Sequence, residues 1–418
     1  MGKECLMRIL IQKFGGTSVQ TKENRTHVIK QIKRAKENDY KVVVVVSALG
    51  RNPDPYATDT LLNMVNYPSP TNSKRELDLL MSCGETIASV VLANELRENG
   101  VDATALTGAQ AGIITNDDFN EAKIKKVNPE RIKQELRTYD VIVVAGFQGR
   151  TTTGDITTIG RGGSDTSATA LGASLQADFV DIFTDVDGIM TADPRVVDSA
   201  RRIDVVTYTE ICNLAYQGAK VIHPRAVEIA MQAKIPIRIR STYSDDVGTL
   251  ITFSRTKDVG IDIDDRLVTG IAHTDEISQL TIEIKDHEDQ ATIFDIIANA
   301  HISVDFIHIG PDNVSFTVPE AVTDQAVQLL KEQKFTVTVR ENCAKVSAVG
   351  AGMTGIPGVV AKITTALRKE NVPILQAADS HTTIWVLVDE KHVKKAVNAL
   401  HDAFLLNELS VYQARVEL

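Results

Sequence analysis

The sequence predicts an α/β protein in which a mainly parallel sheet is sandwiched by helices and is followed by two smaller ferredoxin-like βαββαβ modules. Three observations lead to this fold class. Over about the first 250 residues, β-branched runs alternate with helical patterns, as in sheets covered on both faces. Glycine-rich turns follow several of these runs. From Leu267 onward such turns stop, and a pattern repeats at an offset of 70 residues.

Length and composition narrow the possible classes of protein. A chain of 418 residues is long enough for about three domains. Its net charge of −10 disfavours a general nucleic-acid binder, so no nucleic-acid partner is predicted. No run is long and apolar enough to cross a bilayer, and the N-terminus lacks a signal-like segment, so a cytoplasmic protein without a membrane partner is expected. The cysteines lack metal-ligand or disulfide-framework spacing, so no metal site is predicted: Cys5, Cys83, Cys212 and Cys343.

The valine run Val42–Val46 is the clearest strand signal. Five β-branched residues between polar neighbours indicate a strand buried on both faces, as in parallel sheets. The preceding segment 22–40 carries apolar residues at helical spacing. A long helix is predicted at 73–99, and further strands at 103–106, 141–145, 179–183 and 235–239. Ligands of such sheets lie beyond the carboxyl ends of the strands, so functional residues are expected there.

The stretch Gln12–Ser18 follows the first apolar run and precedes a helical pattern. Its adjacent glycines, Gly15 and Gly16, allow several backbone N–H groups to converge on an anion, and Lys13 adds a positive charge. The pattern is neither a P-loop nor the GxGxxG dinucleotide fingerprint. It predicts a phosphate-binding turn, with a purely structural turn as the alternative.

A second glycine-rich loop, Thr157–Thr166, follows Gly146–Gly149 and enters a helix predicted at 167–174. Arg161, Ser164 and the free N–H groups of a helix N-terminus suit a carboxylate or a phosphate. The alternative is that Ser164 and Asp165 serve only as helix caps.

Two further loops offer charged side chains. Thr184–Gly188 resembles the start of a calcium loop, but Pro194 replaces the glutamate that an EF-hand requires, so that interpretation is excluded. Gly218–Pro224 contains Lys220, a second candidate for phosphate binding, although a lysine at a helix start is commonly just solvated.

The C-terminal repeat aligns Ile302–Val304 with Val372–Ile374, and Val314–Val318 with Ile384–Val388. Each copy has the pattern strand, helix, strand, strand, helix, strand. In the second copy, Gly355–Val359 opens a helix whose free N–H groups can receive an effector carboxylate. The corresponding segment of the first copy, 286–290, is acidic and lacks glycines. We therefore expect the effector site mainly on the second copy, completed by the first copy of another chain. The alternative is that both modules only dimerise.

Taken together, six segments resemble the signatures of aspartokinases, in the same order and spacing: Lys13–Ser18, Ser82–Glu85, Thr158–Asp165, Phe183–Val186, Asp193–Arg195 and Gly218–Pro224. The resemblance covers essentially the whole chain. It implies an amino-acid-kinase domain, similar to carbamate kinase, over residues 1–250, and ACT domains over 265–340 and 341–418. No homoserine dehydrogenase extension is present, which implies a monofunctional enzyme. The segment Gln376–Thr383 is most similar to the diaminopimelate-sensitive isozyme of bacilli.

The resemblance also implies roles for individual residues. Lys13, Lys220 and Asp165 match the catalytic positions, with Asp165 orienting the lysines. ATP-binding positions are matched by Lys13, Phe14, Gly15, Gly16, Thr184, Asp185, Met190, Arg195 and Lys220. Substrate-binding positions are matched by Ser47, Glu85, Phe147, Arg161, Gly162 and Ser164, with Glu85 pairing with the substrate ammonium and Arg161 with its α-carboxylate. Effector-binding positions are matched by Gly355, Ile356, Pro357, Gly358, Val359, Gln376, Ser380, His381 and Thr382. Met190 stands where other members have a tyrosine near the adenine, which puts a hydroxyl contact there in doubt.

The implied activity is phosphorylation of the side-chain carboxylate of L-aspartate by ATP with Mg²⁺, feedback-regulated through the ACT domains. The carboxylate nucleophile, with an ordinary pKa of about 3.9, is ionised at neutral pH, so no general base is needed. Cations must instead offset repulsion between this carboxylate and the phosphates. The expected effector is meso-diaminopimelate, with lysine and threonine as alternatives, and the expected assembly is a homodimer or higher homo-oligomer. A glutamate-kinase-like enzyme and a non-catalytic amino-acid sensor are the alternative functions.

Overall fold

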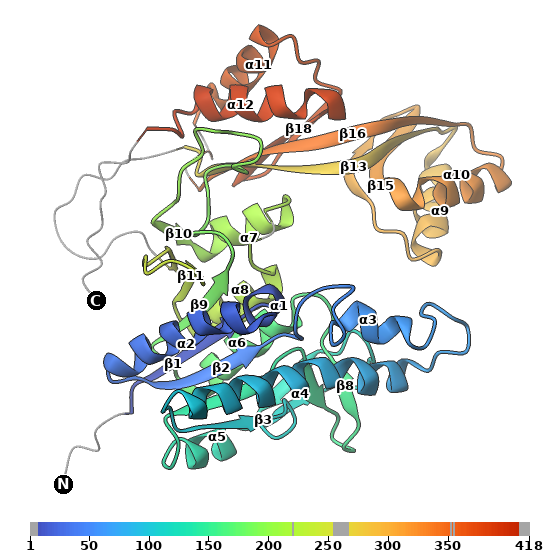
Figure 1. Ribbon diagram of the computed structural model, residues 1–418. Coiled ribbons are helices and arrows are strands. Elements are labelled where there is room, and N and C mark those ends of the chain that lie inside the picture. The colour runs from blue at the N-terminus through green and yellow to red at the C-terminus, as the bar shows by residue number, and fades with distance from the viewer. Residues whose placement is uncertain (1–6, 220, 254–266, 352, 354–355, 409–418) are drawn as a thin grey trace.

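The structure is a computed structural model, and it describes residues 7–219, 221–253, 267–351, 353 and 356–408. Two units follow one another along the chain (Figure 1). The first is built on an eight-stranded sheet and the second on a six-stranded sheet. No helix in the described ranges is long and apolar enough to cross a membrane.

The eight-stranded sheet has the order β10-β12-β11-β9-β1-β2-β6-β3. Its central strands are parallel, and β12 runs antiparallel to β11. The strands span Ile9–Phe14 (β1), Lys41–Val46 (β2), Ala103–Leu106 (β3), Val141–Ala145 (β6), Phe179–Thr184 (β9), Val205–Thr207 (β10), Ile237–Ser241 (β11) and Thr249–Thr252 (β12). A small sheet lies beside it, formed by Ile113–Thr115 (β4), Ile124–Val127 (β5), Gln148–Arg150 (β7) and Ile156–Thr158 (β8).

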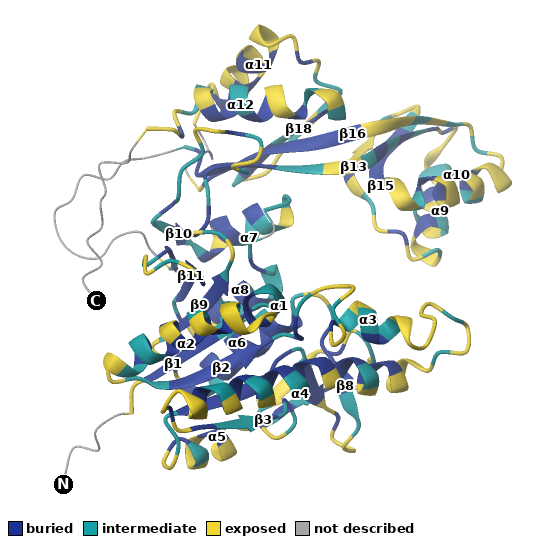
Figure 2. Cartoon of the chain, in the orientation of Figure 1, coloured by how far each residue is buried: buried dark blue, intermediate teal, exposed yellow. Residues whose placement is uncertain are grey.

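Helices cover both faces of the large sheet, as predicted. In β2, Val43 and Val45 belong to one core with residues of α6 (Gly163–Leu175) and α8 (Pro224–Ala233). Val42, Val44 and Val46 belong to another core with residues of α2 (Lys22–Glu37) and α4 (Lys74–Glu98). Figure 2 shows the resulting buried layer between the helices. The helices of this unit span Gly16–Val19 (α1), Lys22–Glu37 (α2), Thr58–Asn63 (α3), Lys74–Glu98 (α4), Glu130–Glu135 (α5), Gly163–Leu175 (α6), Tyr208–Tyr216 (α7) and Pro224–Ala233 (α8).

The helix predicted at 167–174 begins four residues earlier, at Gly163. The reason is Gly162, the residue before the helix, which has φ of 68°, a left-handed conformation that favours glycine. Ser164 and Asp165 consequently lie in the first turn of α6 and face the carboxyl ends of the strands. In the C-terminal repeat, the aligned segments Ile302–Val304 and Val372–Ile374 lie just before the strands Asp305–Ile309 (β14) and Gln376–Asp379 (β17).

The second unit is one continuous sheet of order β14-β15-β13-β16-β18-β17. Its strands are Gly270–Glu283 (β13), Asp305–Ile309 (β14), Asn313–Pro319 (β15), Val337–Val349 (β16), Gln376–Asp379 (β17) and Thr383–Asp389 (β18). Its helices are His287–Asn299 (α9), Thr323–Glu332 (α10), Val359–Lys369 (α11) and Val393–Ala403 (α12). The repeat is visible in β15 and β18, whose bounds differ by the predicted offset of 70.

The two copies share strands. The second half of β13 pairs with β15, and its first half, Gly270–Thr274, pairs with the end of β16. That first half occupies the edge beside β16 where the fourth strand of the second ferredoxin-like copy belongs. The predicted boundary between residues 340 and 341 therefore falls inside β16, and the division into two sequential modules stays a prediction.

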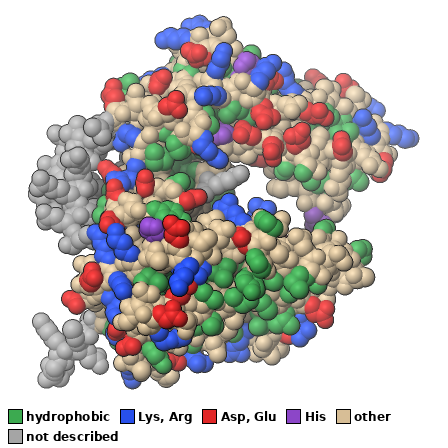
Figure 3. Space-filling view, viewed as in Figure 1, with side chains coloured by type: hydrophobic (Ala, Val, Ile, Leu, Met, Phe, Trp, Pro, Cys, Tyr) green, Lys and Arg blue, Asp and Glu red, His purple; other side chains and the backbone are tan. Residues whose placement is uncertain are grey.

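Acidic and basic side chains are interspersed over the visible face of the molecule (Figure 3).

Candidate active site

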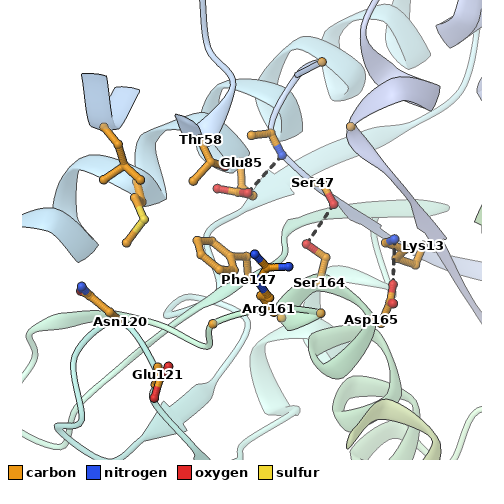
Figure 4. Close-up of a pocket in the computed structure, with 18 of the residues that line it drawn as sticks. Lys13, Ser47, Thr58, Glu85, Asn120, Glu121, Phe147, Arg161, Ser164 and Asp165 are labelled. Carbon is orange, nitrogen blue, oxygen red and sulfur yellow. Dashed lines mark hydrogen bonds and ion pairs between the residues drawn. The ribbon is translucent and has the colours of Figure 1, made fainter. Parts of the chain in front are cut away.

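A cavity of about 650 Å³ opens at the carboxyl ends of β1, β2 and β6, where functional residues were expected. Figure 4 shows its side chains, which come from loops and helices far apart in sequence. The lining includes the predicted residues Lys13, Gly16, Ser47, Glu85, Phe147, Arg161, Gly162, Ser164 and Asp165. It also includes Gly50, Thr58, Leu62, Tyr67, Met81, Asn120 and Glu121, which the sequence analysis did not assign.

Lys13 lies near the end of β1, and its ammonium nitrogen is 2.7 Å from a carboxylate oxygen of Asp165 on α6. At this distance the ammonium and the carboxylate form a close ion pair. Both side chains are largely buried. Weak hydration strengthens such an attraction, which holds the lysine over the cavity.

The two glycines of the first turn have different surroundings. A Cβ added to Gly16 would lie 2.6 Å from the carbonyl oxygen of Ala48, whereas one added to Gly15 would meet only the Lys13 ammonium, at 3.7 Å. Gly16 is therefore required for the close approach of the β1 and β2 loops. The Phe14 side chain is fully buried and stacks on Phe183, so a contact of Phe14 with a nucleotide is possible only through its main chain.

Glu85 lies on α4 and is almost completely buried. One carboxylate oxygen accepts the N–H of Ala48 at 3.1 Å, and the other has no hydrogen-bond partner among the described residues. Burial raises the pKa of Glu85 to about 8, because water no longer stabilises the charged form. A buried acceptor of this kind at a cavity wall is suited to a cationic ligand group.

The N-terminus of α6 forms the opposite wall. The preceding residue, Gly162, provides no side-chain cap, so N–H groups of the first turn are open to an anion. The exposed guanidinium of Arg161 adds a positive charge and has no ion-pair or hydrogen-bond partner in the described part of the chain. The hydroxyl of Ser47 donates to that of Ser164 at 3.0 Å, which joins this wall to the end of β2.

Phe147 follows β6 and has φ of 66°, a left-handed conformation unusual for a phenylalanine. Its N–H donates to the Ser167 hydroxyl at 3.1 Å. A Cβ on Gly163 would lie 2.7 Å from its ring. The glycine at the start of α6 thus allows the ring to pack against the helix terminus beside Arg161 (Figure 4).

The predicted nucleotide residues Thr184, Asp185, Met190 and Arg195 do not line the cavity. Thr184 ends β9 and its hydroxyl donates to Asp185 at 3.0 Å. Arg195 is ion-paired with Asp193 at 2.6 Å and its side chain is exposed. Lys220 lies outside the described residues. The described residues contain no group of three or more metal-ligating side chains.

The predicted effector segment lies at one end of the second ACT copy. Gly358 precedes α11 with φ of 95° and no side-chain cap, whereas the corresponding Asp286 caps α9 with its own carboxylate. The Gly350 N–H donates to the Thr382 carbonyl at 2.9 Å, so the loop before α11 starts beside the turn at residues 380–382.

Other predicted effector residues have structural partners. Gln376 accepts from Gln279 at 2.7 Å and donates to the Phe306 carbonyl at 2.9 Å, which joins the two copies. Ser380 closes the turn before β18 by hydrogen bonds with Thr383. The prediction for Gly355 lies outside the described residues. Exposed or partly exposed positions near α11 and the turn are Ile356, Pro357 and His381, and Val359 is buried.

Helix α7 connects the two units. Its Asn213 amide donates to the Thr382 hydroxyl at 2.7 Å, and the Ser347 hydroxyl donates to the Gln217 side-chain oxygen at 3.0 Å. A Cβ on Gly218 would lie 2.0 Å from the His273 carbonyl oxygen. The segment that leads to Lys220 is therefore packed directly on the ACT sheet.

Comparisons with known proteins agree with this geometry. Residues 8–241 match the amino acid kinase family and residues 338–402 match the ACT domain. The chain is 57% identical to aspartokinase 1 of Bacillus subtilis, over 96% of this chain and 100% of that protein. It is 40% identical to an aspartokinase of Geobacillus stearothermophilus, over 96% of this chain and 98% of that protein.

Solved structures are similar over nearly the full length. Escherichia coli aspartokinase III in complex with aspartate and ADP, described as the R-state, has a TM-score of 0.76 and 26% identity, covering 95% of this chain and 100% of that chain. The same enzyme in complex with lysine and aspartate, described as the T-state, has a TM-score of 0.75 and 27% identity, covering 95% and 99%.

Proposed function

The chain belongs to the aspartokinase family, and from this premise we propose how its residues transfer the γ-phosphoryl group of ATP to the side-chain carboxylate of L-aspartate. The products are 4-phospho-L-aspartate and ADP. A new bond forms between a carboxylate oxygen and the γ-phosphorus while the bond to the β,γ-bridging oxygen breaks. The observation that carries the proposal is the cavity in which a buried acid, an exposed guanidinium and Lys13 face one space.

Glu85 and Arg161 select an α-amino acid. The unpartnered oxygen of Glu85 accepts hydrogen bonds from the substrate ammonium, and binding of that cation favours the ionised carboxylate. Arg161 binds the α-carboxylate, for which its planar guanidinium is well suited. Ser47, Phe147, Gly162 and Ser164 complete the wall around the substrate. The side-chain carboxylate of aspartate is then directed toward Lys13.

Charge neutralisation is the main catalytic contribution. The nucleophile is already ionised at neutral pH, so the barrier comes largely from its repulsion by the phosphate oxygens. Lys13 lowers this repulsion, and Asp165 holds its ammonium group in place. By resemblance to the family, Lys220 acts from the other side of the phosphates, and Gly15, Gly16, Thr184, Asp185, Met190 and Arg195 contact the nucleotide. Mg²⁺ enters with ATP, held by the phosphates and water, and supplies further positive charge.

An amino-acid effector binds at the second ACT copy, where Gly358 leaves the first turn of α11 open. Capping of α9 by Asp286 disfavours a matching site there. Lysine accompanies the T-state of the E. coli enzyme, but the segment Gln376–Thr383 favours meso-diaminopimelate for this chain. Binding alters the turn that contacts Asn213, and α7 transmits the change toward Lys220.

The assembly is a homodimer or larger homo-oligomer through the ACT domains, in the cytoplasm.

The reaction is tested by trapping the acyl phosphate with hydroxylamine. With ATP and Mg²⁺, aspartate is expected to yield a hydroxamate, and glutamate at the same concentration at least about 100-fold less, because its longer side chain misplaces the carboxylate. Equal rates with both amino acids, or no hydroxamate with aspartate, would contradict the proposal. Adding meso-diaminopimelate, lysine and threonine, alone and combined, tests the effector. Unchanged activity under all these conditions would exclude regulation by them.

A further inference from the structure

A buried carboxylate outside the cavity, Asp78, lies on the helix that carries Glu85. Its side chain is inaccessible to solvent. It accepts the Thr158 N–H at 2.9 Å, the Thr158 hydroxyl at 2.5 Å and the Asn120 N–H at 3.0 Å. In the amide orientation that satisfies its surroundings, the Asn120 side chain also donates to Asp78, at 3.0 Å. No described lysine, arginine or histidine forms an ion pair with it. Burial raises its pKa, and the hydrogen bonds from the Thr158 hydroxyl and the two backbone N–H groups oppose this shift by favouring the ionised form.

One partner of Asp78 lines the cavity, and the other lies just before the segment of the wall that begins at Gly160. Thr158 ends β8, three residues before Arg161, and Asn120 lines the cavity itself. The two segments are also joined by the Ala122 N–H, which donates to the Thr158 carbonyl at 2.9 Å. Asp78 therefore fixes the base of the loop that presents Arg161, and it fixes the neighbouring loop at the same point.

Helix α4 relates these loops to Glu85. Asp78 and Glu85 are seven residues apart, which puts them on the same face of the helix, about 10 Å from each other along its axis. Between them, the Ser82 carbonyl accepts the Gln148 amide at 2.8 Å, which anchors the residue after Phe147. One face of α4 thus holds the acid and, through hydrogen bonds, the loops of Phe147 and Arg161.

We propose that Asp78 is a positioning residue that sets the distance between Arg161 and Glu85, and so determines how well the enzyme binds the α-amino-acid head group. This inference rests on the proposed function, because it takes Arg161 as the group that binds the α-carboxylate. The side chain acts through the Thr158–Arg161 loop and does not touch the substrate. Helix α4 carries Glu85 directly and holds the Arg161 loop through Asp78, so one helix fixes the positions of both charged groups.

The test is a double-mutant cycle in the full-length enzyme. Asp78→Asn keeps the shape but removes the negative charge and one of the two acceptor oxygens, so the hydrogen bonds from Thr158 and Asn120 weaken and the Arg161 loop is held less firmly. We expect kcat/KM for aspartate to fall about 10- to 100-fold, as small misplacements of a binding group do. The KM for ATP should stay within about twofold. In an Arg161→Ala background, Asp78→Asn should lower kcat/KM for aspartate by less than about threefold, because the loop no longer presents the guanidinium.

A control on the same helix is Glu95→Gln, which weakens the bidentate ion pair with Arg25; neither residue lines the cavity. It should lower Tm and leave kcat/KM for aspartate within about twofold. If Asp78→Asn does not fold, Thr158→Val removes only the hydroxyl donor, and its expected loss is about three- to tenfold with the same dependence on Arg161.

The possible failures are distinguishable. If Arg161→Ala alone leaves kcat/KM for aspartate unchanged, the proposed role of Arg161 is wrong, and the inference is overturned with it. If Arg161→Ala lowers the value but Asp78→Asn and Thr158→Val do not, only the positioning role is wrong. An equal loss from Asp78→Asn with and without Arg161 would also overturn it, because that result indicates general destabilisation of the cavity.

Discussion

Aspartate binding should be strongly pH-dependent because of Glu85. In the free enzyme, burial and the missing partner of one oxygen raise the pKa of this residue to about 8. At neutral pH the acid is therefore mostly protonated, although only the ionised form can pair with the substrate ammonium. The pKa is raised, so kcat/KM for aspartate should increase as pH rises toward about 8 and then level off.

The size of the effect follows from the fraction of ionised Glu85. With a pKa of about 8, that fraction rises roughly 25-fold between about pH 6.5 and pH 8.5. The assay is kcat/KM for aspartate at saturating ATP across this range. The variant Glu85→Gln keeps an acceptor for the Ala48 N–H but cannot ionise, so its kcat/KM should be low at every pH and lack this rise.

The same raised pKa also predicts how stability depends on pH. Folded Glu85 retains a proton that the unfolded chain loses above its ordinary pKa of 4.5, so this residue lowers the free energy of unfolding as pH rises from 4.5 to about 8. The difference in Tm between Glu85→Gln and the wild-type enzyme should therefore shift in favour of the variant as pH rises from 4.5 to about 8. A wild-type kcat/KM for aspartate that does not change between about pH 6.5 and pH 8.5 would refute the reasoning about Glu85. A rise in kcat/KM that persists in Glu85→Gln would refute it as well.

Three further predictions test other parts of the protein. Lys13→Ala should lower kcat about 100- to 1,000-fold and change the KM for aspartate much less, because the ammonium neutralises charge in the transition state; an unchanged kcat would exclude this role. Gly16→Ala should destabilise the enzyme by about 1 to 3 kcal/mol in urea unfolding, since its Cβ meets the Ala48 carbonyl at 2.6 Å, whereas Gly15→Ala should have a much smaller effect. Equal losses would contradict the difference in packing. Gly358→Trp should relieve inhibition by the effector, because φ of 95° is unfavourable for a residue with a Cβ and the added side chain occupies the space before α11. The uninhibited kcat should be retained, because Gly358 does not line the cavity. Retained inhibition would place the effector elsewhere.

Much of the fold could be predicted because its signals are local. The valine run of β2 is buried on both faces of the sheet, and the apolar residues of α4 are buried at helical spacing. Both elements therefore lie where the sequence predicted them. The rule that ligands bind beyond the carboxyl ends of parallel strands pointed to the loops of Lys13, Ser47 and Phe147, and residues of all three loops line the cavity. The resemblance to aspartokinases was confirmed by the comparisons.

Other features depend on contacts between distant segments. The role of Asp78 was not predicted, because an isolated acid in a helical pattern indicates a solvated face unless its partners at Asn120 and Thr158 are known. The pKa of Glu85 depends on burial by several elements. The sharing of β13 and β16 between the ACT copies was also missed, since a sequence repeat indicates two similar units but not how their strands are paired.

The central claim is that the two ends of the amino-acid head group bind Glu85 and Arg161, which leaves the side-chain carboxylate facing Lys13. It is tested most directly by a crystal structure of the enzyme with L-aspartate and a non-hydrolysable ATP analogue. The account predicts the ammonium at about 3 Å from the free oxygen of Glu85 and the side-chain carboxylate nearest Lys13 and the γ-phosphate. An aspartate bound in the reverse orientation, with its α-carboxylate nearest Lys13, would contradict it.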